Sequence, residues 1–511
     1  MKLTTAQLDR AAGVLVTTAV GDALGAGYEF GPALPATMPI TMKGGGPFGF
    51  APAEWTDDTS MAIVIATSLL DALDAGHSPA GARSLASMVT GWQDWAAGSK
   101  DVGAQTSSVL HRASQLMAEG SRPDEAAFVA ARAHHEATGR SAGNGSLMRT
   151  APLALAFLNS EADLWEAAAA VSTLTHYELD ATEACQLWTA AIRHAVLTGE
   201  LDVRVGLSWL TDERAELWRS RIAVAEASQP CDFTSNGWVV EAFQGAWSAI
   251  FHAVAANGVG PDSLRFALEN AVRGGNDTDT VAAIAGGLIG AAAGYSAIPE
   301  EWRRKLHGWG ADGERELMAL ALELVAGGRK FGTWPRIPAM DYGDWRGIGT
   351  VVQHPDDTEV WIGGSAQLPF LGSAEAATEC GLPAALGEVS AVVSLCRIGR
   401  DDAPAVAAEN HVTFWLVDSA DPAENAHLEF VLRDAAQAVA QFRAEGHTVY
   451  LHCVQAESRT PTVAALYGAL LGGSALESLD RVSRELPNPH PNAAFMEVLR
   501  HSDGQALGHT S

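Results

Sequence analysis

Two short acidic motifs carry the residue types that divalent-metal chemistry needs. One is Trp55-Thr56-Asp57-Asp58-Thr59, and the other is Gly274-Gly275-Asn276-Asp277-Thr278-Asp279-Thr280. Each places two carboxylates and neighbouring hydroxyl groups directly before an apolar run of helical character. Four carboxylates brought together repel one another unless they are neutralised, and two divalent cations would balance their charge. Oxygen donors with no histidine or cysteine nearby favour Mg²⁺ or Mn²⁺ over Zn²⁺.

Helix capping is the alternative interpretation of both motifs. Thr and Asp side chains accept hydrogen bonds from free N–H groups at a helix start, and acidic groups suit the positive end of the helix dipole. On a regular helix Asp277 and Asp279 would point to opposite sides. To share a metal ion they must lie in the turn before the helix, which Gly274-Gly275 permits.

A third motif combines a cysteine with an arginine. The run Thr448-Val449-Tyr450-Leu451-His452-Cys453 predicts a strand that ends in the cysteine, and Arg459 follows five residues after it. Pro461 indicates that a helix begins here, because a proline at the first helical position costs no backbone hydrogen bond. Backbone N–H groups at a helix N-terminus bind oxyanions and lower the pKa of a thiol, and an arginine can hold phosphate in a bidentate manner. The motif therefore predicts a phosphate cradle.

Helical segments must position the acidic motifs. Up to about residue 330 the apolar residues recur at helical spacing, as in the segments Leu8 to Ala19, Glu161 to Ser172 and Ala181 to Leu197, without strand-like alternation. The most apolar stretch, Val281 to Ile298, is about long enough to span a bilayer. Because it consists largely of alanine and glycine and follows a polar motif, we expect a buried helix instead.

After Gly327-Gly328 the pattern changes. The segment Thr333 to Gly349, rich in proline, glycine and tryptophan, is typical of a linker. Strand-like runs then alternate with helical runs, which indicates an α/β domain with a largely parallel sheet. The predicted strands are Glu359 to Ile362, Ala391 to Cys396, Val412 to Val417 and Thr448 to His452, and the predicted helices are Leu428 to Glu445 and Thr462 to Leu471. We therefore predict two domains, residues 1–335 and 345–511.

Composition limits the possible partners. Hydrophobic residues make up 47% and charged residues 18% of the chain, which excludes wholesale disorder. The net charge of −28 argues against direct binding to nucleic acid or to an anionic membrane. Cys185, Cys231, Cys380 and Cys396 form no disulfide or zinc pattern and are interpreted as small buried residues. Free thiols and an N-terminus without the apolar core of a signal peptide predict a cytoplasmic protein.

Four motifs in order resemble the ADP-ribosylglycohydrolases, a family that includes the dinitrogenase-reductase-activating glycohydrolases. The resemblance covers roughly residues 8 to 300. The motifs are Gly21-Asp22-Ala23-Leu24-Gly25 with Glu29, Trp55-Thr56-Asp57-Asp58-Thr59, Gly143-Asn144-Gly145-Ser146-Leu147-Met148-Arg149 and Asp277-Thr278-Asp279-Thr280. The resemblance implies an all-α domain whose binuclear magnesium centre cleaves the glycosidic bond of ADP-ribose on a modified protein.

The resemblance also implies roles for individual residues. Two metal-ligand sets match Thr56, Asp57 and Asp58, and Asp277, Asp279 and Thr280. A catalytic acidic residue at the mouth of the site matches Glu29, and a loop that holds the diphosphate matches Gly143, Asn144, Gly145 and Ser146. His176 matches a position that lines the ligand cleft.

The chemistry agrees with these roles. Glycosidic cleavage needs an oxocarbenium-like state to be stabilised and a water to be positioned, and two metal ions can do both. The proton can be moved by Glu29 or by a metal-site aspartate such as Asp57 or Asp279. Three purely structural interpretations stay open: the glycine loop could be a plain turn, His176 a structural histidine and Asp22 a structural cap.

The cysteine motif resembles the dual-specificity and tyrosine phosphatase superfamily over about residues 345 to 500. Trp361-Ile362-Gly363-Gly364-Ser365 and Trp415-Leu416-Val417-Asp418 also fit that pattern. The match makes Cys453 the nucleophile, Arg459 the phosphate clamp, Asp418 the general acid with Asp421 as a second candidate, and Thr460 an aid to the departing thiolate.

This motif departs from the phosphatase pattern at two positions. Ala456 stands where many members have glycine, and Glu457 brings a negative charge to an anion-binding loop. A phosphatase fold kept for binding alone is therefore an alternative.

We predict an Mg²⁺-dependent enzyme, with Mn²⁺ also possible, that removes ADP-ribose from a modified protein or cleaves an ADP-ribose derivative. Its second domain is an α/β phosphatase-like domain that could act on a phosphorylated target. Two alternatives remain open. The phosphatase could carry the main activity beside an ADP-ribose-binding module, or the second domain could be a non-catalytic docking module.

Overall fold

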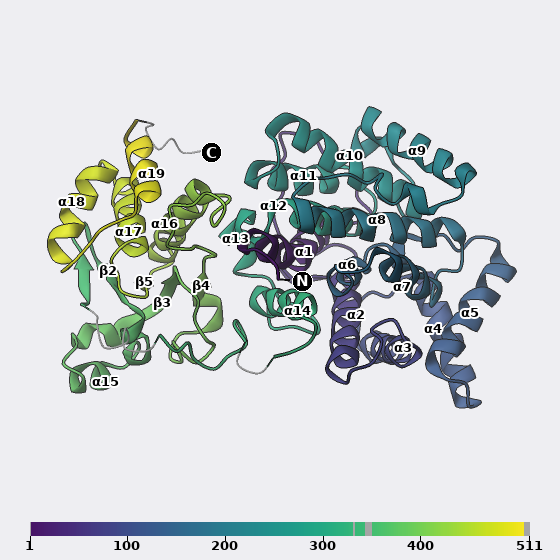
Figure 1. Ribbon diagram of the computed structural model, residues 1–511, viewed down its shortest axis with the longest axis horizontal. Coiled ribbons are helices and arrows are strands. Elements are labelled where there is room, and N and C mark those ends of the chain that lie inside the picture. Colours follow the sequence, from purple (N-terminus) through teal and green to yellow (C-terminus); the bar gives the residue numbers. More distant parts are fainter. Residues whose placement is uncertain (1, 331–332, 343–349, 505–511) are drawn as a thin grey trace. The chain divides into compact units, whose positions relative to one another are not determined.

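The structure is a computed structural model in which residues 2–330, 333–342 and 350–504 are described. They form two compact units (Figure 1). Residues up to 298 together with 305–330 make the first unit, and residues 299–304 together with those after 330 make the second. The second unit therefore takes in a short segment that the two contiguous domains of the sequence prediction did not anticipate. Position 345, where we expected the second domain to begin, lies outside the described residues.

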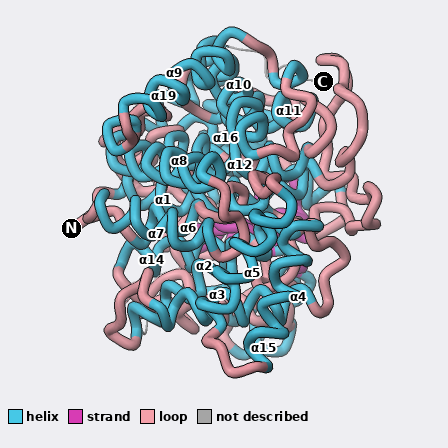
Figure 2. The backbone as a smooth tube through the Cα atoms, turned by 90° about the vertical axis from the view of Figure 1, so that its right-hand side faces the viewer, coloured by secondary structure: helices cyan, strands magenta, loops and turns pink. Residues whose placement is uncertain are grey.

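The first unit is helical, as predicted. In its described part, extended pairing is limited to isolated bridges such as Gly31 with Asn276. Its α-helices are α1 (Thr5–Gly25), α2 (Asp57–Asp74), α3 (Ala82–Ala96), α4 (Ala104–Ala118), α5 (Pro123–Thr138), α6 (Ala151–Ala156), α7 (Glu161–Thr173), α8 (Leu179–Thr198), α9 (Asp212–Ala227), α10 (Val239–Asn257), α11 (Pro261–Arg273), α12 (Thr278–Ala293) and α14 (Glu314–Ala326). Figure 2 shows how far helices outweigh strands in the chain.

Helices α1 and α12 pack with their backbones almost in contact, and this brings two of the motifs together. A Cβ atom at Gly21 would lie 2.1 Å from the Ala282 carbonyl oxygen, and one at Gly25 would lie 2.3 Å from the Asp279 Cα. Only glycine allows so close an approach. The glycines of Gly21-Asp22-Ala23-Leu24-Gly25 therefore place Asp22 beside the start of α12.

The apolar stretch predicted as a buried helix is α12. Each of its residues is buried, which accounts for a composition that is apolar all round. Among the described residues, no helix combines the length and hydropathy that crossing a membrane requires.

The second unit contains a five-stranded mixed sheet in the order β1-β2-β5-β3-β4. The first pair is antiparallel and the others are parallel, which confirms a largely parallel sheet. The strands are β1 (Val352–His354), β2 (Asp357–Gly364), β3 (Val389–Ser394), β4 (His411–Thr413) and β5 (Thr448–Cys453). The helices are α13 (Glu300–Arg303), α15 (Ala374–Glu379), α16 (Leu428–Ala444), α17 (Arg459–Leu470), α18 (Ala475–Glu485) and α19 (Ala493–Gly504).

Both faces of this sheet are covered. Side chains of α16 and α17 pack on one face with Val360, Val393 and Leu451, while Leu368, Ala377 and Leu386 cover the other. All six residues of β5 are buried, as expected for a central strand between parallel neighbours. Cys453 ends β5 opposite Gly364 of β2, so the cysteine lies at the carboxyl edge of the sheet.

Two details of the sequence prediction are wrong. Strand β4 ends at Thr413 instead of continuing to Val417. Cys231 and Cys380 are exposed instead of buried, whereas Cys185 and Cys396 are buried as expected.

Candidate functional site

A cleft of about 280 Å³ in the first unit brings the predicted site residues together. Nine of them line it: Glu29, Asp57, Gly143, Asn144, Gly145, His176, Asp277, Asp279 and Thr280. Thr56 and Asp58 are buried just beneath, at the start of α2. The hydroxyl of Ser146 faces the core instead, where Ser172 and Cys185 contact it. Any contact of Ser146 with a ligand in the cleft must therefore come from its backbone.

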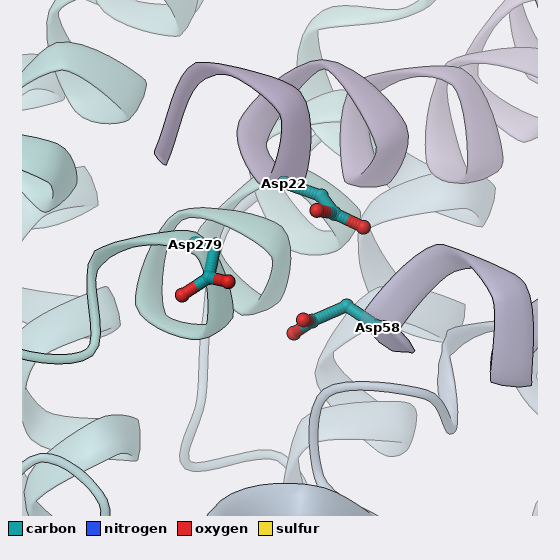
Figure 3. A group of neighbouring side chains, drawn as sticks. All are labelled: Asp22, Asp58 and Asp279. Atoms are coloured by element: carbon teal, nitrogen blue, oxygen red, sulfur yellow. The ribbon is translucent and has the colours of Figure 1, made fainter. Parts of the chain in front are cut away.

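The carboxylates fall into two groups that share Asp279. Asp22, Asp58 and Asp279 each have an oxygen within 4.8 Å of the others, and so do Glu29, Asp277 and Asp279. Figure 3 shows the first group, in which three separate helices supply the side chains. The grouping resembles the two predicted ligand sets, but Asp22 takes the place of Asp57 in one and Glu29 joins the other.

Asp22 caps α2 from a neighbouring helix. Its carboxylate accepts hydrogen bonds from the Thr56 N–H at 2.8 Å, the Thr59 N–H at 3.0 Å and the Thr59 hydroxyl at 2.6 Å. Thr56, the N-cap residue, makes no side-chain cap hydrogen bond, and its hydroxyl donates to Asp58 at 3.0 Å. The expected structural cap therefore serves α2, while the Asp57 and Asp58 carboxylates remain available to the site.

Only one of the two aspartates lies in the turn before α12, contrary to the prediction. Asp277 is the N-cap residue, whereas Asp279 belongs to the first turn of the helix, and the two carboxylates still have oxygens within 4.8 Å of each other. Gly275 and Asn276 adopt left-handed backbone conformations with φ of 78° and 60°, and Asp277 ends the turn as the N-cap residue. The Asn144 amide donates to Asp277 Oδ2 at 2.7 Å, and the Asn236 side chain accepts from the Asp277 N–H at 3.0 Å. The Asn144 side chain thus holds the turn, a role that the sequence did not predict.

Burial and mutual repulsion raise the carboxyl pKa values throughout the cluster. Burial, reinforced by the charges of Asp277 and Asp101, raises the pKa of Glu29 to about 8. Burial raises the pKa of Asp22 to about 6, although hydrogen bonds from Thr59 and Thr56 oppose the shift. For Asp57, Asp58 and Asp279 the pKa lies well above the usual range for the same two reasons. Positive charge in the cleft would offset the repulsion and favour the ionised form of these carboxyl groups.

Three buried oxygens of the cluster have no hydrogen-bond partner among the described residues: Glu29 Oε2, Asp58 Oδ1 and Asp279 Oδ1. A buried acceptor left without a donor costs free energy unless something else satisfies it. Carboxylate oxygens from a turn (Glu29) and from two helices (Asp58 and Asp279), left without hydrogen bonds in this way, fit the hard-donor coordination that Mg²⁺ and Mn²⁺ use.

The glycine loop lies against His176. A Cβ atom at Gly143 or at Gly145 would approach the His176 Nε2 to 3.3 Å, so a side chain there would fill the space above the ring. The imidazole Nδ1 lies 2.7 Å from the Thr175 hydroxyl. His176 is therefore both a satisfied buried histidine and a residue of the cleft.

The sequence analysis missed several residues that line the cleft, among them Asp101, Gln105 and Phe30. Asp101 lines it, and burial together with the charge of Asp277 raises its pKa to about 6. Gln105 bridges the Ser141 and Thr175 carbonyls. Phe30, 66% exposed, contributes an aromatic ring at a backbone φ of 56°. A charged loop before a helix and an aromatic residue beside Glu29 were the only available signals, and neither distinguishes a site from an ordinary surface.

A second hollow adjoins the cleft through Gly143 and Gly237. It has a volume of about 310 Å³ and is also lined by Arg140, Glu178 and the indole of Trp238, which is 40% exposed. An aromatic ring and a cation beside the cleft extend the surface that a long ligand can contact.

The cysteine motif forms a separate site in the second unit. Cys453 is buried, and α17 begins at Arg459. The Arg459 guanidinium donates to the Leu395 carbonyl at 2.8 Å and to the Leu416 carbonyl at 3.2 Å. Its Nε and the Thr460 hydroxyl are buried without hydrogen-bond partners among the described residues. Two unsatisfied groups able to donate beside a thiol at a helix N-terminus suit an oxyanion.

The loop of this site accommodates both departures from the pattern. Ala456 has a φ of 58°, the left-handed region in which glycine is favoured. The Glu457 carboxylate accepts from the Asn488 amide at 3.1 Å and lies 3.8 Å from the His490 ring, so residues outside the loop hold its charge.

The two candidate general acids of this site differ in their surroundings. The Asp418 carboxylate accepts from the Ser458 hydroxyl at 2.7 Å, next to the cradle. Asp421 instead uses its side chain to accept from the Ala423 N–H at 2.9 Å within its own turn. Asp418 is therefore the better placed of the two.

Comparisons with known proteins point to one family for the first unit. The family model described as ADP-ribosylglycohydrolase matches residues 3–331. An ADP-ribosylarginine hydrolase, Tri1, from Pseudomonas putida (strain GB-1) is 29% identical over 306 residues, which cover 58% of this chain and 74% of that protein. The ADP-ribosyl-[dinitrogen reductase] glycohydrolase of Rhodospirillum rubrum is 29% identical over 303 residues, covering 58% of this chain and 90% of that protein.

Two solved structures match parts of this chain, each with a TM-score below 0.5. One described as an ADP-ribosylglycohydrolase-related protein complex is 28% identical, with a TM-score of 0.45, and covers 64% of this chain and all of that one. A structure of human DUSP28 is 19% identical, with a TM-score of 0.24, and covers 30% of this chain and 92% of that one.

Proposed function

This chain belongs to the ADP-ribosylglycohydrolase family, and we propose that its helical unit hydrolyses the glycosidic bond that joins ADP-ribose to an arginine side chain of a modified protein. The observation that carries this proposal is the cleft whose carboxylates come from separate helices and leave three buried oxygens unpaired. The arginine linkage follows from the similarity to proteins named as ADP-ribosylarginine hydrolases. A cleft bordered by Glu29 and Asp101 also suits a cationic guanidinium group.

Two divalent cations, Mg²⁺ or Mn²⁺, are part of the proposal. Asp22, Asp58 and Asp279 would hold one, and Glu29, Asp277 and Asp279 the other, with Thr56, Asp57 and Thr280 adjoining them. Bound there, the cations would hold the ribose hydroxyls and lower the pKa of a water near the anomeric carbon.

The protein groups supply the remaining functions. Glu29, whose Oε2 has no partner, is placed to exchange a proton with the attacking water or with the leaving guanidine, and Asp57 or Asp279 is the alternative. Backbone N–H groups of the segment 143–146 would hold the diphosphate, because successive N–H groups in a turn make an anion-binding concavity.

The experiment measures ADP-ribose released from an arginine-ADP-ribosylated protein, with Mg²⁺ and with EDTA, for the wild type and for Asp279→Asn. We expect release that requires the cation and falls by at least about 100-fold in the variant, as for the loss of a group that stabilises the transition state. Asp212→Asn is the matched control, because Asp212 is exposed and occupies the first position of α9. Full activity of Asp279→Asn, or full activity in EDTA, would refute the metal site.

We propose a second function for the second unit: a cysteine-dependent site for a phosphorylated target. Arg459 Nε and the Thr460 hydroxyl favour it, because both lie beside Cys453 without a hydrogen-bond partner among the described residues. Asp418, whose Oδ2 lies 3.8 Å from Arg459 Nε, is placed to protonate a leaving group. Hydrolysis of a phosphotyrosine peptide, lost in Cys453→Ser, would support a phosphatase.

Two other outcomes remain for this unit. Binding of inorganic phosphate that is lost in Arg459→Ala, without turnover by the wild type, would instead support a docking module. Phosphatase turnover together with ADP-ribose binding but no ADP-ribose release would make the phosphatase the main activity. All five cysteines are free thiols, and we place both activities in the reducing cytoplasm.

A further inference from the structure

A buried arginine lies behind the ligand cleft, and no carboxylate of the described residues forms a hydrogen bond or an ion pair with it. Arg149 is fully buried, and its guanidinium carbon stacks 3.9 Å from the centroid of the Trp92 ring. One of its terminal nitrogens donates to the Thr175 hydroxyl oxygen at 2.5 Å, and the other contacts the Met61 sulfur at 3.7 Å. Burying a cation without a negatively charged partner costs free energy. An arginine that donates to a neutral hydroxyl in the interior is therefore unusual.

Arg149 determines the direction of the hydrogen bond between the Thr175 hydroxyl and the His176 ring. An arginine only donates, so the Thr175 oxygen must accept from Arg149. Thr175 is fully buried, and the acceptor in reach of its own proton is the Nδ1 of His176, 2.7 Å away. If that nitrogen carried a proton, the Thr175 hydroxyl proton would be buried without an acceptor among the described residues, which costs free energy.

We propose that Arg149 and Thr175 form a relay that fixes His176 in the tautomer protonated at Nε2, so that a neutral imidazole donates a hydrogen bond to the diphosphate of the bound ligand. The ligand part of this proposal rests on the proposed function. The Nε2 edge lies against Gly143 and Gly145, which leave room above the ring. Phosphate oxygens only accept hydrogen bonds, so the opposite tautomer would direct a lone pair at them.

The backbone around the relay is held before any ligand binds. The His176 N–H donates to the Ser172 carbonyl at 2.9 Å, and the Gln105 amide donates to the Thr175 carbonyl at 3.0 Å. The relay therefore needs no rearrangement on binding, and Arg149 and Thr175 act as positioning residues.

The neutral state of His176 agrees with this arrangement. Burial, together with the positive charge of Arg149, holds the pKa of His176 well below its usual range. A neutral imidazole has one protonated nitrogen, and its identity is set by the partner of the other.

The first measurement is the ¹⁵N spectrum of histidine-labelled full-length protein, with His176 identified as the signals lost in His176→Gln. The wild type should show an unprotonated Nδ1 and a protonated Nε2. Thr175→Val keeps the β-branched shape but removes the hydroxyl, and should release the tautomer preference. Thr175→Ser should restore it. The control is Thr173→Val, because the Thr173 hydroxyl only bonds to carbonyls of its own helix.

The second measurement is ADP-ribose binding in Mg²⁺ and the kinetic constants for the modified protein. We expect Thr175→Val to weaken binding and raise KM by roughly tenfold, the value of about one charge-assisted hydrogen bond, while kcat changes less than about threefold. A merely structural role would leave the tautomer unchanged and lower stability instead.

Two results would overturn the relay: a protonated Nδ1 in the wild type, or an unchanged tautomer in Thr175→Val. Unchanged ADP-ribose binding in Thr175→Val would overturn the donor role. A wild type with the expected tautomer but no ADP-ribose binding would support the relay and refute the proposed function, so the two can fail separately.

Discussion

Metal binding at the carboxylate cluster should strengthen steeply as the pH rises from 6 to 8. Without a cation, burial holds the pKa of Glu29 near 8 and those of Asp22 and Asp101 near 6. The folded chain therefore binds protons in this range that the unfolded chain, with ordinary carboxyl pKa values, does not bind. A raised pKa of this kind favours the folded state at low pH and weakens it as the pH rises.

The size of the effect follows from the number of protons involved. Each proton held only by the folded state changes the stability by about 1.4 kcal/mol per pH unit. Between pH 6 and pH 8 the folded state holds nearly one extra proton on Glu29 and a fraction of a proton on each of Asp22 and Asp101. Together these protons change the stability by about 3 kcal/mol. Solvent reaches Glu29 and Asp101 in the cleft, and screening reduces the figure to about 1.5 to 3 kcal/mol.

A bound cation displaces these protons. The binding free energy of Mg²⁺ should therefore become more favourable by the same amount between pH 6 and pH 8. The dissociation constant is expected to fall about 10- to 100-fold between pH 6 and pH 8. Buried neutral histidines, His176, His354 and His452, have lowered pKa values that act in the opposite direction on overall stability. They lie in both the free and the Mg²⁺-bound protein, so their contributions cancel in the affinity.

Isothermal titration of Mg²⁺ at three pH values, in buffers of different ionisation enthalpy, gives both the affinity and the number of protons released. Glu29→Gln should release about one proton fewer near neutral pH, while Asp212→Asn should behave as the wild type. An affinity that does not change with pH, or that falls as the pH rises, would refute this account of the cluster.

Three further changes test the positioning elements. Asp22→Ala should lower the free energy of unfolding of the first unit by about 2 to 4 kcal/mol in urea denaturation, because buried N–H groups of Thr56 and Thr59 lose their acceptor; a loss below about 1 kcal/mol would contradict the capping role. Phe30→Gly should keep stability within about 1 kcal/mol, because relief of the left-handed backbone offsets the flexibility of glycine, yet should raise KM for the modified protein; a clear drop in melting temperature would show that packing dominates. Arg304→Ala should destabilise only the second unit, by about 1 to 3 kcal/mol, because Arg304 pairs with Glu445 at 2.6 Å and stacks on Phe442; a change confined to the first unit's unfolding transition would be the contrary result.

The elements that are buried on every side were predictable from their continuous apolar runs. The apolar run in α12 and the strand β5 both appear in the sequence, because complete burial demands apolar residues on every side. The edge strand β1 and the helices α18 and α19 were missed. An edge strand of three residues offers too few alternations to detect, and α18 buries only Ala475, Ser478 and Val482.

Segments whose partners are remote in the sequence could not be placed. Residues 299–304 follow α12 after a short 3-10 turn (Tyr295–Ala297), yet Glu300 donates its N–H to Asp434 in α16, 134 positions later. Nothing in the local sequence of α13 distinguishes it from a further turn of the helical unit. The same limit applies to Asp101 and Gln105, which enter the cleft because of how α4 packs and not because of any pattern around them.

The position of Asp22 shows why the capping and metal interpretations could not be separated from sequence. Both interpretations predict Thr and Asp at the start of an apolar helix, so the sequence does not distinguish between them. In the structure Asp22 satisfies the first N–H groups of α2 from the end of α1, at a position fixed by the close glycine contacts with α12. Because the cap comes from another helix, Asp58 can leave Oδ1 without a hydrogen bond to the described residues, and its carboxylate points toward Asp279 (Figure 3). Capping by Asp22 thus leaves the carboxylate of Asp58 available to the proposed metal site.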